Sequence, residues 1–521
     1  MINIVGSGLA GLSAAITLAE SGRKCNLISL QESQRAQSVM AEGGINAALN
    51  TMGENDSIAE HYEETMRGGA YLADPDSVAD LTEHAPEIVM WLKKLGVPFE
   101  IKDGRIVQRN FGGQKKKRTA FVKSSTGKML MSALIDEARK YEIQGLINRY
   151  SHHRVYDLIT EANRCIGLKM IDTYTDEAYN VYGPVILACG GLGGLFTGFT
   201  TGSAENTRPF AADLLVKGVT LANLEMIQYH PTTAAISGKR MLVSEAARGE
   251  GGRFMTYRNN EPYYFMEELY PEQKNLTTRD VATRAVDRIM HDETCCGKVY
   301  LDMTHLDQSV WKNKLSDMRD EMHDYFGIDI AKEPFEISPG IHYFMGGIYV
   351  DRNHRTSLSG LYAAGECACQ YHGANRLGGN SLLGAVYGGR TAAGHIADDP
   401  DERMERTTVI KEELDTSGEV SETIRDILLK GLGIVRNRET LEEACSDLSD
   451  LTAKIQYPAD RHKALLAEAM LKSALERKES RGAHYREDYP DSDDRYRKTT
   501  VVSYDGEIHV EFKDLPERSR S

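Results

Sequence analysis

The chain lacks several features that define familiar classes of protein. No apolar run reaches the roughly 18 residues of a membrane-spanning helix, and none of the eight cysteines forms a C-x-x-C pair typical of zinc or iron–sulfur sites. The formal net charge of −15 argues against a nucleic-acid-binding surface. The one basic run, "KKKR" at 115–118, is short and indicates a solvated loop. We therefore expect no membrane insertion, no metal and no nucleic acid.

Signals for export and for repetition are also missing. The chain opens "MINIVGSG", directly into an apolar strand, and shows no secretory leader, internal repeat or low-complexity linker. With 521 residues and 41% hydrophobic residues, it can bury a large core divided among two or three domains. A cytoplasmic protein with free thiols is the expectation.

What is present begins at the N-terminus with a strand, a glycine-rich turn and a helix. Gly6, Gly8 and Gly11 form G-x-G-x-x-G, and Glu32 follows a second strand, close to where an acidic group binds a ribose. Such a turn exposes backbone N–H groups at a helix N-terminus, which suits a pyrophosphate. A merely structural tight turn is the weaker alternative.

Later segments predict an α/β fold with an insertion. Two buried strands that end in glycines, within 182–194 and 357–368, are expected to join the N-terminal strand in one sheet. We expect a cofactor domain at 1–224 and 335–405, an inserted domain at 225–334, and a helical domain at 406–521 with a polar, partly strand-like tail. A helix is predicted from about 74 to 95.

Histidine and arginine recur among small residues from residue 230 onward. The segments are "QYHPTT", "SEAARGEGGRF", "TTRD", "HYFMGG" and "HGANRLGG". Arginines among glycines are unlike solvated charges, and bidentate arginine is a preferred partner of carboxylates. Each of these residues alone could be structural, but together they predict a clamp for a small dicarboxylate.

These motifs resemble the flavoprotein subunit of fumarate reductase and succinate dehydrogenase, a family that includes L-aspartate oxidase. The resemblance extends along nearly the whole chain, through "GSGLAGLSAA", "AEGGINAAL", "FGGQ", "HPT", "EAARGEGG", "TRD", "HYFMGGI", "GLYAAGE", "HGANRLGGNSLL", "GIVRN" and "ESRGAHYREDYP". It implies an FAD domain of the glutathione-reductase type, an inserted α+β capping domain over the flavin, and a C-terminal helical domain.

The resemblance also assigns site residues. Those implied to bind FAD are Gly6, Ser7, Gly8, Ala10, Gly11, Ser29, Glu32, Gln37, Ser38, Glu42, Gly43, Gly44, Glu366, Ser381 and Leu382. Those implied to hold the substrate carboxylates are His230, Thr232, Ser244, His342 and Arg376. Arg279 would donate the proton, resupplied through Glu245 and Arg248; because free arginine has a pKa above about 12, that role comes from the resemblance and not from the residue type.

Three departures from the family pattern matter. The membrane-bound members link FAD to a histidine in "SHTVAAEGG", where this chain has "AQSVMAEGG" with Gln37, so we expect noncovalent FAD and a preference for fumarate reduction. Thr207–Phe210 replace the usual T-G-D-G. Phe111 replaces the glutamate that meets the amino group in aspartate oxidases, which have "REGG" where this chain has "NFGG".

Two alternatives and one gap remain. Aspartate oxidation is disfavoured by Phe111, and a flavin-bearing tRNA-modifying protein is disfavoured by the negative charge. No cluster ligands and no second nucleotide-binding glycine loop are evident, so electrons must come from an iron–sulfur partner subunit or a soluble reductant. Any contact with a membrane is expected only through partner subunits.

Overall fold

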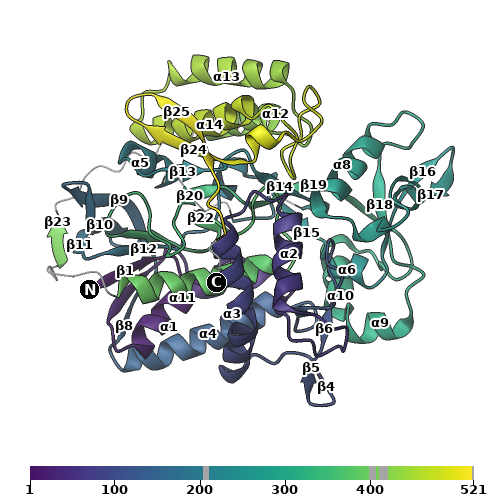
Figure 1. The fold of residues 1–521 in the computed structure, drawn as a ribbon, viewed down its shortest axis with the longest axis horizontal. Helices are drawn as coiled ribbons and strands as arrows, with labels where there is room; N and C mark the ends of the chain where they lie inside the picture. The colour runs from purple at the N-terminus through teal and green to yellow at the C-terminus, as the bar shows by residue number, and fades with distance from the viewer. Residues whose placement is uncertain (204–209, 237, 398–405, 410–419, 519–521) are drawn as a thin grey trace.

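A computed structural model describes residues 1–203, 210–236, 238–397, 406–409 and 420–518. The Thr207–Phe210 segment departs from the family pattern. Most of it belongs to residues 204–209, which lie outside the described ranges. Figure 1 shows three regions, with the N-terminal elements below, the segment around α8 and β16–β18 at the right, and the C-terminal helices at the top.

The N-terminal region is built on a five-stranded parallel sheet in the order β21-β12-β1-β2-β8. Its strands are β1 (Ile2–Val5), β2 (Cys25–Ile28), β8 (Ile147–Tyr150), β12 (Val185–Leu187) and β21 (Leu361–Ala363). The predicted assembly of one sheet from distant segments is confirmed, since Val5 pairs with Leu187 and Leu187 with Ala363.

Both faces of this sheet are covered, as a parallel sheet requires. One face packs on the helices α1 (Leu9–Glu20), α4 (Thr126–Ile143) and α11 (Asn380–Ile396). The other packs on an antiparallel sheet of β9 (His153–Glu161), β10 (Arg164–Asp172), β11 (Ala178–Tyr182) and β23 (Arg406–Val409). The predicted helix near 74–95 is α3 (Pro75–Lys94), capped by the Asp74 side chain.

The segment at the right of Figure 1 folds on a six-stranded sheet in the order β15-β14-β19-β18-β16-β17. The strands are β14 (Ile227–Ile236), β15 (Lys239–Leu242), β16 (Arg253–Arg258), β17 (Glu261–Tyr263), β18 (Val299–Asp302) and β19 (Phe335–Phe344). Helices α8 (Arg279–Met290) and α10 (Ser316–Phe326) share its apolar core, which includes Phe254 and Phe335. The long strands β14 and β19 pair with each other and connect this segment to the rest of the chain.

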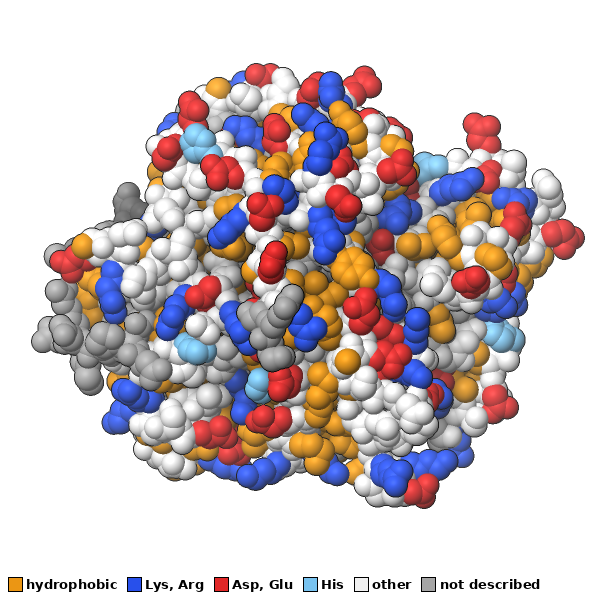
Figure 2. Space-filling view, in the orientation of Figure 1, with side chains coloured by type: hydrophobic (Ala, Val, Ile, Leu, Met, Phe, Trp, Pro, Cys, Tyr) orange, Lys and Arg blue, Asp and Glu red, His pale blue; other side chains and the backbone are white. Residues whose placement is uncertain are grey.

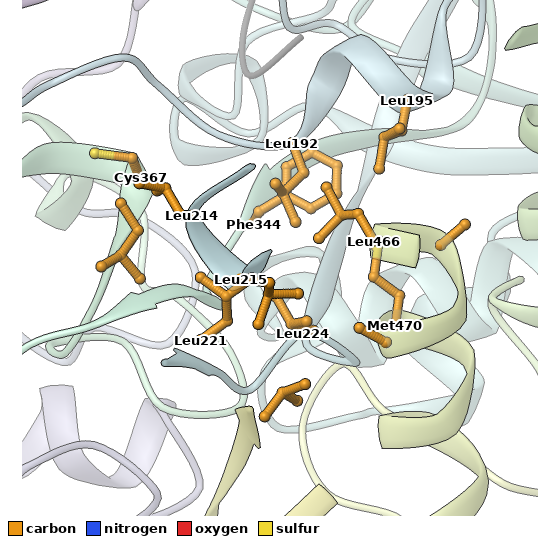
Figure 3. Packing of buried hydrophobic residues seen from close by; sticks show 14 of the residues in the cluster. Leu192, Leu195, Leu214, Leu215, Leu221, Leu224, Phe344, Cys367, Leu466 and Met470 are labelled. Carbon is orange, nitrogen blue, oxygen red and sulfur yellow. The ribbon is translucent and has the colours of Figure 1, made fainter. Parts of the chain in front are cut away.

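The C-terminal region contains α12 (Ser421–Gly431), α13 (Arg438–Thr452) and α14 (Pro458–Glu476), followed by the hairpin β24 (Lys498–Tyr504) and β25 (Ile508–Asp514). Helix α14 places Leu466 and Met470 against leucines that precede β14, among them Leu214 and Leu224 (Figure 3). The first of these helices begins at Ser421, whereas Arg406–Val409, at the start of the predicted helical domain, form β23 beside β11. Strand β24 pairs with β13 (Leu221–Ala222), which joins the tail to the strands leading into β14.

The surface carries charges of both signs. On the face shown in Figure 2, basic and acidic side chains are interspersed and no broad basic area is visible. No helix in the described ranges is long and apolar enough to cross a membrane.

Candidate active site

A cavity of about 1260 Å³ opens at the carboxyl ends of the parallel strands and extends beneath β14 and β19. This exceeds the roughly 300–1,000 Å³ of ordinary small-molecule pockets. Every residue assigned to FAD from the sequence lines the cavity except Gly11, and among the predicted substrate-site residues all do except Thr232 and Arg248.

The glycine-rich turn forms one wall of the cofactor end. Gly6 has a φ of 111°, which favours glycine, and a Cβ there would overlap the carbonyl oxygen of Ala188. Helix α1 has Gly8 as its N-cap residue, with no side-chain cap and no acidic residue in its first turn, so its N-terminus can face a phosphate. Gly11 contributes packing, since a Cβ there would overlap the Gly6 carbonyl oxygen.

The ribose-binding candidates lie at the end of β2. Ser29 is buried, and its Oγ has no hydrogen-bond partner within the protein. Glu32 lies farther out and pairs with His152, with 3.3 Å between Oε1 and Nε2. The Ser29 hydroxyl can donate to or accept from ribose hydroxyls, the Glu32 carboxylate can accept from them, and Ser29 is the better buried of the two.

Residues 35–44, which were predicted to lie against FAD, line the cavity except for Val39. Gln37 and Ser38 belong to a 3₁₀ turn, where the Gln37 Nε2 donates to the carbonyl oxygen of Thr201 at 3.0 Å and the Ser38 Oγ accepts from the Leu9 N–H at 3.3 Å. The Gln37 amide is therefore a hydrogen-bonding group at the position of the family's linking histidine.

The segment ends at a buried carboxyl and a glycine pair. Burial, together with the charge of Glu321 on α10, raises the pKa of Glu42 to about 8. Gly43 leaves room for the Phe111 ring, because a Cβ on Gly43 would lie 2.9 Å from that ring. Gly43, Gly44 and Phe111 all line the cavity, so the glycine pair brings backbone to its wall.

Three further residues complete the cofactor end. Glu366 follows β21, and burial raises its pKa to about 7, while its Oε1 accepts from the Phe344 N–H at 3.1 Å. Ser381 and Leu382 lie in the first turn of α11. Polar groups from separate strand ends thus converge on one elongated space.

The substrate end has two facing imidazoles on neighbouring strands. His230 lies on β14 and His342 on β19, with ring centroids 5.1 Å apart in a T-shaped arrangement. Burial, and then the positive charge of Arg279, lowers the pKa of both well below the usual value, so both rings are neutral. The Thr201 Oγ1 lies 2.7 Å from the His342 Nδ1, and the buried His230 Nε2 has no protein partner.

Arg279 begins α8 and is held by a carboxylate. Its Nε and Nη2 donate to the Glu245 Oε2 at 2.9 and 2.7 Å. The other oxygen, Glu245 Oε1, pairs with Arg248 Nη2 at 3.1 Å and accepts from the Gly112 N–H at 3.1 Å. Burial alone would raise the pKa of Glu245, but the two arginines outweigh it and lower that pKa to about 2. Arg279, Glu245 and Arg248 therefore form a continuous buried row.

Arg376 approaches from the loop before α11. Burial, and then the charge of Arg279, lowers its pKa to about 9. Its Nη2 donates to the Gln228 Oε1 at 3.1 Å, and the Arg279 Nη1 donates to the same oxygen at 3.0 Å. Gln228 was missed from the sequence, although it precedes His230 by two residues and so shares its face of the strand.

The remaining predicted residues differ in their placement. Phe111 and Ser244 line the cavity. Thr232 does not, because its Oγ1 donates to the Val243 carbonyl oxygen at 2.7 Å and lies 3.2 Å from the His230 Nδ1. Thr232 thus supports the imidazole, and Arg248 lies behind Glu245 with its Nη1 on the Asn275 carbonyl oxygen.

The charge at this end is unbalanced. Three arginines, Arg279, Arg376 and Arg248, outnumber the carboxylates near them, which are Glu245 and, on the cofactor side of Arg376, Glu366. In a buried site such an excess favours a ligand that brings negative charge of its own. No group of three or more metal-ligating side chains occurs within the ranges that the structure describes.

Comparison with known proteins identifies the ligand of the cofactor end. The model of the FAD-binding domain matches residues 2–382, and the model described as "Fumarate reductase flavoprotein C-term" matches residues 421–519. The Ser29 hydroxyl, the uncapped N-terminus of α1 and the glycine pair at the cavity wall fit this cofactor. The chain is thus an FAD-dependent oxidoreductase.

Full-length relatives are more specific. The succinate dehydrogenase flavoprotein subunit of Bacillus subtilis is 36% identical, with 99% of this chain and 95% of the relative covered. One subunit of the fumarate reductase (CoM/CoB) of Methanothermobacter marburgensis is 34% identical, with 96% of each chain covered. Among solved structures, E. coli quinol fumarate reductase FrdA superposes with a TM-score of 0.87 at 28% identity, covering 100% of this chain and 97% of that one.

This chain belongs to the family of succinate dehydrogenase and fumarate reductase flavoprotein subunits. The expected fold is confirmed, with an FAD-binding α/β part, a capping part and a C-terminal helical part.

Proposed function

We propose that this flavoprotein reduces fumarate to succinate. The observation that carries the proposal is the row Arg279–Glu245–Arg248, whose Arg279 end lines the cavity beside two neutral imidazoles and Arg376. An excess of positive charge suits a dianion, and a guanidinium held by a carboxylate at the cavity wall can deliver a proton at a fixed point. M. marburgensis and Wolinella succinogenes relatives are named fumarate reductases, at 34% and 33% identity.

The side chains would have distinct roles in the reaction. His230, His342, Ser244 and Arg376 hold the two carboxylates and so fix the alkene. FAD, when bound, supplies the hydride. Arg279 gives the proton to the carbon opposite the hydride.

The proton on Arg279 must then be replaced. Glu245 contacts both arginines, with Oε2 on Arg279 and Oε1 on Arg248. Removal of a proton from Arg279 leaves the Glu245 charge facing a neutral partner, which favours proton movement from Arg248 along the row.

FAD would be held without a covalent bond. Gln37 stands where the family's linking histidine would be, and a carboxamide nitrogen is not a usable nucleophile for that bond. Acid precipitation of the purified protein should leave all flavin in the supernatant. Yellow colour that stays in the pellet would contradict this.

The missing bond also bears on direction, because in this family the covalent link raises the flavin potential. We expect fumarate reduction by reduced dye to be much faster than succinate oxidation by oxidised dye. Equal or faster succinate oxidation in the same preparation would overturn the proposed direction.

The electron donor would be a partner iron–sulfur subunit or a soluble reductant, and this chain would meet a membrane only through such partners. Within the chain, we propose residues 225–334 as the cap, 1–224 with 335–405 as the FAD domain, and 406–521 as the C-terminal domain. Co-purification from native cells, with iron analysis of what is retained, tests the donor.

A further inference from the structure

The loop that carries Thr201 runs beside β19 at the level of His342. The Thr201 N–H donates to the carbonyl oxygen of Ile341 at 2.9 Å, and the Ile341 N–H donates to the carbonyl oxygen of Phe199 at 3.1 Å. Thr200 and Ile341 form a parallel bridge, so the loop follows β19 like a short extra strand. Because Ile341 immediately precedes His342, this pairing places Thr201 beside the imidazole.

A second hydrogen bond holds the other side of Thr201. Its carbonyl oxygen accepts from the Gln37 Nε2 at 3.0 Å. The N–H of Thr201 is therefore held by a strand of the substrate end, and its carbonyl group is held by a residue of the cofactor wall. The position of the Thr201 side chain is thus set by groups on both sides.

The Thr201 hydroxyl contacts the imidazole directly. Its Oγ1 lies 2.7 Å from the His342 Nδ1, and neither atom has another hydrogen-bond partner among the described residues. His342 lines the cavity, and no described residue bonds to its Nε2. His230 differs, because its Nδ1 is surrounded by the N–H, the carbonyl oxygen and the hydroxyl of Thr232. Of the two imidazoles, His342 is the one that is held through a single hydroxyl.

The direction of this hydrogen bond decides which ring nitrogen carries the proton. Burial, and then the charge of Arg279, lowers the pKa of His342 well below its usual value, so the neutral ring has one N–H. If the Nδ1–H donates to Thr201, the Nε2 presents a lone pair to a ligand. If the Thr201 hydroxyl donates to Nδ1, the proton lies on Nε2, which then becomes a donor. A carboxylate only accepts hydrogen bonds, so the second arrangement alone lets His342 bind one.

We propose that Thr201 is a positioning residue, whose hydroxyl donates to the His342 Nδ1 and keeps on Nε2 the proton that the ring offers to a substrate carboxylate. This role rests on the proposed dicarboxylate substrate, whereas the location of the proton is a property of the protein without substrate. Gln37, at the position of the family's linking histidine, supports the role because it anchors Thr201. The residue that replaces the flavin link thus contributes indirectly to dicarboxylate binding.

Two substitutions at Thr201 test the binding role. Thr201→Val removes the hydroxyl and nearly keeps the side-chain shape, whereas Thr201→Ser keeps the hydroxyl. Fumarate binding to the oxidised, FAD-loaded protein is measured from the change in flavin absorbance, since oxidised flavin does not reduce fumarate. We expect the valine variant to bind about ten- to a hundredfold more weakly, as for loss of a hydrogen bond to a charged group. The serine variant should bind nearly as the wild type does, and equal affinity of the valine and serine variants would overturn the proposal.

A matched control removes a threonine hydroxyl elsewhere. Thr452 is half-buried on α13, and its Oγ1 donates to the Leu448 carbonyl oxygen at 2.7 Å. Thr452→Val should bind fumarate as the wild type does. A loss in this variant as large as that in Thr201→Val would show a general effect of removing a hydroxyl and would overturn the specific role of Thr201.

The proton on His342 can be located directly. Long-range nitrogen–proton NMR is recorded on the substrate-free holoprotein, isotope-labelled at histidine, with His342→Gln to assign the signals. We expect the proton on Nε2 in the wild type and in Thr201→Ser, and shared between the two nitrogens in Thr201→Val. A proton on Nδ1 in the wild type, or the same form in the valine variant as in the wild type, would overturn the proposal. If the spectra follow the expectation but the wild type binds no fumarate, the proposed substrate is wrong and the hydrogen-bond direction stands.

Gln37 gives a smaller, independent test. Gln37→Ala removes the anchor of the Thr201 carbonyl group, so fumarate should bind about fivefold more weakly at full flavin occupancy, as for loss of an ordinary hydrogen bond. In the Thr201→Val background the same change should have little further effect, because it acts through the missing hydroxyl. Equal losses in the two backgrounds would overturn the contribution of Gln37.

Discussion

The two ends of the cavity are built in different ways. The cofactor end consists largely of backbone turns and small residues, such as Gly6 and Gly43, whose shape excludes larger side chains. The substrate end consists of charged side chains that hold one another, with Glu245 between two arginines. A large ligand that stays bound can be recognised by shape, whereas a small ligand that is exchanged at each turnover requires charge at defined points. Single substitutions at the substrate end should therefore mainly affect turnover, and those at the cofactor end should mainly affect FAD affinity.

The largest effect that would sharpen this contrast is expected from Arg279→Ala. A positioned general acid contributes roughly 10²- to 10⁴-fold. Fumarate turnover should fall by that factor or more while FAD content stays the same, because the cofactor end is untouched. Arg288→Ala, which removes an exposed arginine from the same helix, should leave turnover near normal.

The alternative is that Arg279 only anchors the helix α8. In that case the alanine variant would keep appreciable fumarate reduction and would instead melt at a lower temperature. Turnover, bound flavin and melting temperature measured on one preparation distinguish the two.

A smaller effect, about a hundredfold in rate, is expected when a substrate places a charge beside Phe111. Aspartate would place its ammonium near this apolar ring, and an unpaired buried charge costs on the order of a few kcal/mol. Wild-type protein should thus release peroxide with aspartate some hundredfold more slowly than it reduces fumarate.

Substitutions at Phe111 make that prediction sharper. Phe111→Glu should raise aspartate oxidation and lower kcat/KM for fumarate, because a carboxylate then opposes a dianion. Phe111→Leu keeps the site apolar and serves as the control, with fumarate reduction retained. Rates for aspartate and fumarate that are similar in the wild type would show that Phe111 does not discriminate.

The smallest effect concerns pH at the cofactor end. The pKa of Glu366 is raised to about 7, so the carboxylate that can accept from FAD hydroxyls exists above that pH and is lost below it. FAD affinity should therefore fall by up to about tenfold for each pH unit below 7. Flavin fluorescence titrations at several pH values measure this, and Glu366→Gln should bind FAD more weakly and without that dependence. An equally steep dependence in Glu366→Gln would assign the titration elsewhere.

Much of the fold could be predicted because the signals are local. Apolar strands that end in glycines identified the parallel sheet, and the glycine-rich turn identified the nucleotide end. The site residues could be grouped because histidines and arginines stand out among small residues. Their exact roles remain predictions.

What could not be predicted depends on partners far apart in the sequence. Arg118 ends the "KKKR" run that was expected to be solvated, yet it is fully buried and pairs with Asp56 and Glu64. Gln228 has no local pattern that reveals its two arginine partners. Arg406–Val409 became a strand because β11 offers an open edge, which no nearby residue indicates. The structural role of a charge run or a lone polar residue therefore depends on its tertiary neighbours.

The pairing of β14 with β19 has a consequence for how such enzymes can diversify. The chain leaves for the inserted segment and returns from it along one two-stranded ribbon, in which Tyr229 lies opposite Ile341. Opposed residues in such a ribbon are only about 5 Å apart, close enough for a two-residue turn to join them. The insertion can therefore be exchanged for another without rerouting the sheet that binds FAD. Glu245 and Arg279 lie in the segment between these strands, so a change of insertion would change the reaction and leave the cofactor in place.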